Sequence, residues 1–62
     1  MNAISLLKRE HLEYKRALEK SRELYAIGKI DKQLHKIHVE NLTFLIEEFT
    51  KAINILEKAY SQ

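Results

Sequence analysis

The chain has 62 residues, of which 45% are apolar and 32% charged, and its formal net charge is +2. This length allows one small domain, residues 1–62, and the composition is typical of a folded protein. The absence of cysteine excludes disulfides, thiolate zinc sites and thiol catalysis. A chain this short is marginally stable alone, so we expect a second subunit or another partner to stabilise it.

The longest apolar run covers only residues 44–46, so no membrane-spanning segment and no membrane partner are predicted. The first residues lack a basic region followed by a long apolar core, so no signal peptide is predicted. We therefore expect a cytoplasmic protein. Lysine outnumbers arginine eight to three and isoleucine outnumbers valine seven to one, which indicates an AT-rich genome and fits a phage or mobile element.

Residues 3–27 are predicted to form the first helix, because no glycine or proline interrupts them and apolar side chains recur at helical spacing. Asn2 or Ser5 is in position to cap its start. The apolar face is thin, since two of its seven positions are polar. These positions are Ile4, Leu7, His11, Tyr14, Leu18, Ser21 and Tyr25.

Residues 28–31 are predicted to form a turn between two helices. Gly28 follows the last periodic residue, where a glycine with a positive φ commonly ends a helix. Asp31 is in position to cap the next helix. Because the connection is short, the two helices are expected to be antiparallel neighbours in an all-α hairpin.

The second helix is predicted over residues 32–60, and it is apolar on more than one side. The first helix is too thinly apolar to cover it, so a lone hairpin would expose an apolar patch. We therefore predict that two hairpins dimerise into a four-helix bundle. The expected oligomer interface comprises Leu42, Leu45, Ile46, Phe49, Ile53, Leu56 and Tyr60.

Phe44 and Ile55 lie off the main apolar stripe of the second helix, and Tyr60 lies near its end. We expect these three side chains to contact a protein partner outside the dimer, since aromatic and aliphatic side chains anchor many interfaces. The alternative is that they pack at the dimer seam.

The chain has three histidines, a residue type that binds metals and changes its charge near neutral pH. His35 and His38 are three residues apart, but two imidazoles do not complete a metal site, and no metal or cofactor is predicted. His11 is expected to face Ile46, if paired residues sum to about 57, as a hydrogen-bonded core or interface residue; the alternative is a pH-sensitive interface.

A basic edge on the first helix supports a second interpretation. Lys8, Lys15 and Arg22 recur every seven residues and could contact a phosphate backbone, as in a small dimeric nucleic-acid-binding regulator. Interleaved glutamates, including Glu19 beside Arg22, neutralise part of this edge. We therefore rank nucleic acid below a protein partner.

No catalytic arrangement or phosphate-binding loop is present in the sequence, so no enzymatic activity is predicted. The expected function is a small protein–protein interaction module that acts as a regulator, adaptor or inhibitor of a larger partner. A purely structural assembly unit is a third possibility.

Overall fold

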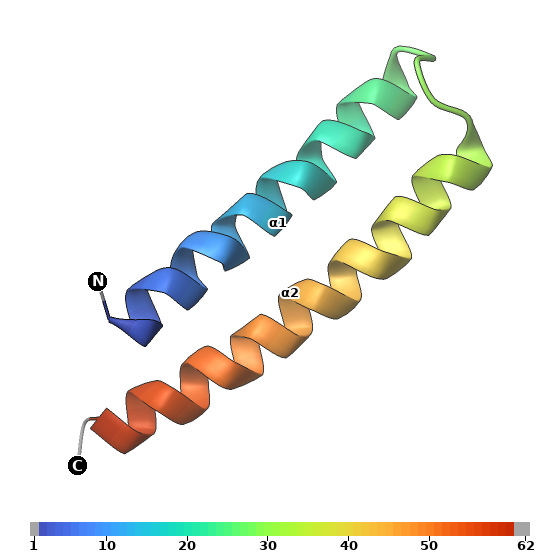
Figure 1. Ribbon diagram of the computed structural model, residues 1–62. Coiled ribbons are helices and arrows are strands. Elements are labelled where there is room, and N and C mark those ends of the chain that lie inside the picture. Colours follow the sequence, from blue (N-terminus) through green and yellow to red (C-terminus); the bar gives the residue numbers. More distant parts are fainter. Residues whose placement is uncertain (1, 61–62) are drawn as a thin grey trace.

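A computed structural model describes residues 2–60. This part of the chain forms two α-helices and no strand: α1 spans Ala3–Ala26 and α2 spans Lys32–Tyr60. The two helices run antiparallel, side by side, and the N- and C-terminal ends lie at the same end of the molecule (Figure 1). The predicted all-α helical hairpin is therefore confirmed.

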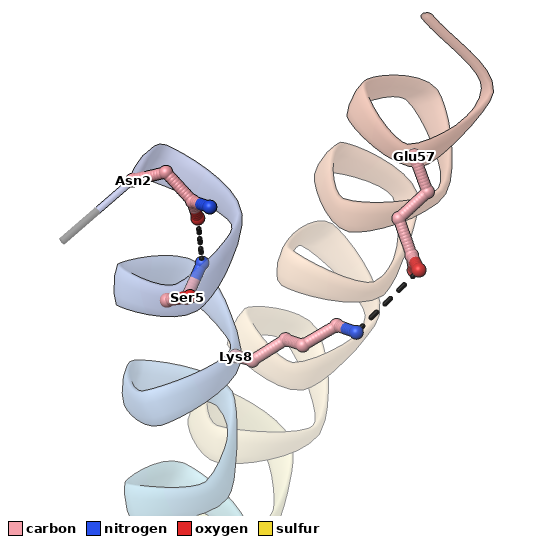
Figure 2. Close-up of polar contacts among 4 residues, drawn as sticks. All are labelled: Asn2, Ser5, Lys8 and Glu57. Atoms are coloured by element: carbon pink, nitrogen blue, oxygen red, sulfur yellow. Dashed lines mark hydrogen bonds and ion pairs between the residues drawn. The ribbon is translucent and has the colours of Figure 1, made fainter. Parts of the chain in front are cut away.

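The start of each helix is fixed by a side chain that accepts a backbone hydrogen bond. Asn2 Oδ1 accepts from the Ser5 amide at 2.8 Å, so Asn2 is the cap of α1 (Figure 2). Asp31 Oδ1 accepts from the Leu34 amide, also at 2.8 Å, at the start of α2. Each contact satisfies an amide that has no partner within the helix, and the Asp31 carboxylate also faces the positive end of the helix dipole.

The end of α1 is set by Gly28, which has a φ of 78°, as predicted. The Lys29 amide donates to the Leu24 carbonyl at 2.8 Å, and the Gly28 amide donates to the Tyr25 carbonyl at 3.1 Å. This pair of bonds is the Schellman arrangement that closes many helices. The helix ends at Ala26, one residue before its predicted end, because Ile27 is the C-cap residue.

The helices pack along one seam, and the core between them is thin. Tyr14 of α1 meets Phe49 of α2 edge to face, with ring centroids 5.2 Å apart. Among the apolar side chains of residues 2–60, only Ile53 is buried, at 7% exposure. The other apolar residues of the seam are half-buried: Ile4, Leu7, Leu18, Leu24, Val39, Leu42, Leu45, Ile46 and Leu56.

The register of the two helices differs from the predicted one near His11. We expected His11 to face Ile46, but its hydrogen bond is to Thr50, one helical turn further along α2. The prediction assumed a constant pairing sum set by the turn. The observed pairs, Ser21 with His38 and Lys8 with Glu57, show that this sum rises away from the turn.

Candidate functional site

Apart from the turn residue Ile27, the most exposed large apolar side chains of the described residues lie on α2. Two of them lie on its outer face, and Tyr60 lies at its end, seven residues after the buried Ile53. Phe44 is 61% exposed, Ile55 is 67% exposed and Tyr60 is 71% exposed. Phe44 and Ile55 are eleven residues apart, which is close to three helical turns, so they lie in one line along the helix. The three residues expected to bind a partner are therefore all accessible in a single chain.

The residues expected to form the oligomer interface occupy a different position. Phe49 packs on Tyr14 of the same chain, and Ile53 is buried within the hairpin. Leu42, Leu45, Ile46 and Leu56 are half-buried within one chain, whereas Tyr60 is exposed. Most of this set thus contributes to packing between α1 and α2, and its atoms are only partly available to a second copy.

One side of the α1–α2 seam is polar. Lys8 Nζ lies 3.4 Å from Glu57 Oε2 (Figure 2), and His11 Nε2 lies 2.9 Å from Thr50 Oγ1. The Thr50 hydroxyl donates its proton to the Ile46 carbonyl at 2.8 Å. His11 therefore carries a proton on Nε2 and donates it to Thr50, since a hydroxyl has a single proton. We call Lys8, His11, Thr50 and Glu57 the polar side of the seam.

A serine joins two histidines near the turn. Ser21 Oγ lies 3.0 Å from His35 Nδ1 and 3.0 Å from His38 Nδ1, and Ser21 is 3% exposed. The His35 ring also stacks on Tyr25, with centroids 4.7 Å apart and planes inclined by 10°. These contacts connect α1 to the first turns of α2 and so stabilise the closed end of the hairpin. We call Ser21, Tyr25, His35 and His38 the Ser21 cluster.

The Ser21 cluster was not predicted as a unit. The sequence shows Ser21 as a polar interruption of an apolar stripe, and such an interruption is the signal that it requires a polar partner across the seam. The identity of that partner depends on the rotation of α2 about its axis. That rotation is fixed by packing along the whole helix, and no local motif specifies it.

The two histidines are arranged around a hydroxyl, with both Nδ1 atoms directed at Ser21. Within residues 2–60, no group of three or more histidine, aspartate or glutamate side chains has the geometry to hold a metal ion. A shallow, open depression of about 330 Å³ lies at the start of α2, lined by Asp31, Gln33, Leu34 and Ile37. The Asp31 carboxylate in this depression is engaged in helix capping.

The basic edge of α1 lies beside acidic groups. Lys8 is ion-paired with Glu57 on α2, and Arg22 Nη1 lies 3.8 Å from Glu19 Oε2. Both pairs are exposed, and exposed pairs contribute little to stability. They do reduce the positive potential that Lys8, Lys15 and Arg22 would present to a phosphate backbone.

Neither α1 nor α2 has a stretch long and apolar enough to cross a bilayer, over the part of the chain that the structure describes. Comparison with known proteins found no matching family model, no matching curated protein and no matching solved structure.

Proposed function

We propose that this protein is a small, non-catalytic, cytoplasmic interaction module. It self-associates into a four-helix bundle and presents the outer face of α2 to a larger protein, as a regulator, adaptor or inhibitor. The observation that carries the proposal is the exposure of Phe44 and Ile55, at 61% and 67%, on the side of α2 that faces away from α1. Large exposed apolar patches mark interaction sites in small proteins.

Self-association is supported by the lack of a closed core in one chain. Only Ile53 among the described apolar residues is buried, while Leu6, Leu12 and Leu34 are exposed in one chain. A hairpin has one layer of helices, and a stable helical domain buries its apolar faces between two layers. A second hairpin supplies the missing layer with the same surface.

Partner binding is supported by the pattern along the back of α2. Ile37, Phe44 and Ile55 are separated by seven and eleven residues, close to two and three turns, and form one line that we call the outer stripe. Between Phe44 and Ile55, Lys51 Nζ and Glu48 Oε1 form an ion pair at 3.6 Å, which keeps this part of the helix hydrated. A helix that binds in an apolar groove of a partner typically carries apolar side chains in one line, with charged residues between them. The outer stripe has this pattern.

The free energy available from burying apolar side chains favours a protein partner over nucleic acid. Full burial of Phe44 and Ile55 would contribute roughly 1.5–3 kcal/mol each. Each phosphate contact by the basic edge would be weakened by salt, and Lys8 and Arg22 already have acidic neighbours. The nucleic-acid regulator remains the rival, because Lys8, Lys15 and Arg22 do lie along one line of α1.

The test is affinity capture from the native host with the intact protein and two variants, followed by mass spectrometry. The first variant, Phe44→Ala/Ile55→Ala, should lose partner binding at least about tenfold, because both anchors are removed without emptying the seam. The second, Lys8→Ala/Lys15→Ala/Arg22→Ala, should retain the same partner. Circular dichroism should show native helix content for both variants.

Two results would contradict the proposal. One is a partner retained by the Phe44→Ala/Ile55→Ala variant at full strength. The other is salt-sensitive binding of RNA or DNA in a gel-shift assay that the basic triple variant eliminates, which would establish the nucleic-acid regulator instead. A protein that binds only itself under all these conditions would be a structural assembly unit.

A further inference from the structure

The two sides of the α1–α2 seam differ in chemistry. Lys8 and His11 lie on the same side as Glu57 and Thr50, since their side chains are in contact. Residues rotated the other way around each helix must therefore share the opposite side. This opposite side, which we call the apolar side, carries Leu6, Ala17, Leu24, Leu45, Ala52 and Ala59.

The apolar side suits a second copy of this chain. Its apolar side chains are leucine and alanine, which allow close helix approach, and Leu24, Leu45 and Ala52 are only half-buried by the hairpin. On α1, charged residues alternate with these apolar residues. The hairpin measures 48 by 19 Å across this face. That area is sufficient for the roughly 800 Å² that each partner buries in a standard stable interface.

The order of charges on α1 gives the direction of pairing. Spaced by three and four residues along the apolar side of α1 are Leu6, Glu10, Glu13, Ala17, Lys20 and Leu24. If a second α1 lies antiparallel with its residue numbers summing to 30, Leu6 meets Leu24 and Glu10 meets Lys20 of the second copy. Two-fold symmetry produces each of these contacts twice.

The other two-fold arrangement lays α1 over α2 of the second copy. The Lys8–Glu57 and His11–Thr50 contacts place Glu10 at the level of Ala52 along the hairpin. In that arrangement Glu10 would meet the Ala52 region of the second copy, where no cation lies on the apolar side of α2. A carboxylate brought against an apolar surface without a partner is unfavourable.

We infer that two hairpins pair through the apolar side of the seam, with α1 antiparallel to α1, and that reciprocal Glu10–Lys20 ion pairs set this register. The turns of the two copies then lie at opposite ends of the bundle. The outer stripe of α2 and the polar side of the seam both stay accessible. This inference rests on the self-association proposed above and specifies the surface and the direction of pairing.

Charge reversal tests the register. Sedimentation equilibrium should show dimer dissociation constants raised about tenfold or more by Glu10→Lys and by Lys20→Glu, because each change places like charges together twice. The double variant Glu10→Lys/Lys20→Glu should return to within about threefold of the unmodified protein. Glu23→Lys, the same charge change on the far side of α1, should have little effect, and circular dichroism should show all variants folded.

Spin-label distances test the direction independently of these charges. The chain contains no cysteine, so Arg16→Cys and Glu23→Cys each place a single label on the outer side of α1. In the antiparallel dimer the two Glu23 labels are displaced by about 24 Å along the helix axis, and the two Arg16 labels by about 3 Å. In the other arrangement, in which both turns lie at one end, the distance between the two labels is the same for position 16 as for position 23.

The outcomes separate this inference from the function proposed above. A dimer with equal label distances, or with no recovery in the double variant, overturns the antiparallel pairing and leaves self-association intact. A protein that stays monomeric at every concentration overturns both.

Discussion

At the scale of single residues, the Ser21 hydroxyl belongs to a buried side chain that contacts two histidines. It has one proton and lies 3.0 Å from two imidazole nitrogens, Nδ1 of His35 and Nδ1 of His38. Because a hydroxyl has one proton, Ser21 can donate to at most one of the two rings, and at least one Nδ1 therefore carries a proton and donates to Oγ.

Replacing Ser21 by alanine should destabilise the protein by about 1 kcal/mol or more. The change leaves two half-buried ring nitrogens without their partner, and an unsatisfied buried polar group is costly. Urea unfolding of Ser21→Ala and of the matched control Ser5→Ala, an exposed position on the same helix, measures the difference. Equal stability of the two variants would contradict a structural role for the Ser21 cluster.

At the scale of elements, the helix boundaries were predictable because the signals that set them are local. Asn2, Gly28 and Asp31 each act within a few residues of their own position. The sequence identified Gly28 and Asp31, and it left the cap of α1 open between Asn2 and Ser5. The residue opposite His11 was predicted to be Ile46, but His11 is hydrogen-bonded to Thr50, because the pairing depends on the relative rotation and rise of the two helices. The Ser21 cluster was missed for the same reason.

The end of α1 offers a clean test of backbone conformation. A Cβ at position 28 would meet nothing within 4 Å, so the cost of a substitution there arises from the positive φ and not from a clash. Gly28→Ala should lower the free energy of unfolding by about 1 kcal/mol, and Gly28→Val by more. Gly28→Asn is the matched control and should cost less than alanine, because asparagine tolerates this conformation.

Thermal or urea unfolding of the three Gly28 variants measures the order of their stabilities. The account would be contradicted by an alanine variant as stable as the unmodified protein, or by an asparagine variant less stable than the alanine variant. Either result would show that the positive φ of residue 28 does not determine the cost of these substitutions.

At the scale of the whole molecule, the hairpin is long and thin. Its Cα extents of 48 × 19 × 11 Å describe one layer of helices, and Ile53 is its single buried apolar residue among those described. From the width of the apolar stripe on α2, the sequence predicts a second layer of helices, which stays a proposal. Most of the residues expected at the oligomer interface pack between α1 and α2 of one chain, and their part in self-association stays a prediction.

The central claim is that this chain is fully folded only when paired with a second copy. Sedimentation equilibrium over a range of micromolar concentrations, combined with thermal unfolding of the same samples, measures it directly. The account predicts a mass of twice 7.4 kDa and an unfolding midpoint that rises with protein concentration, because folding is coupled to association. A folded species of 7.4 kDa whose midpoint does not change with concentration would contradict it.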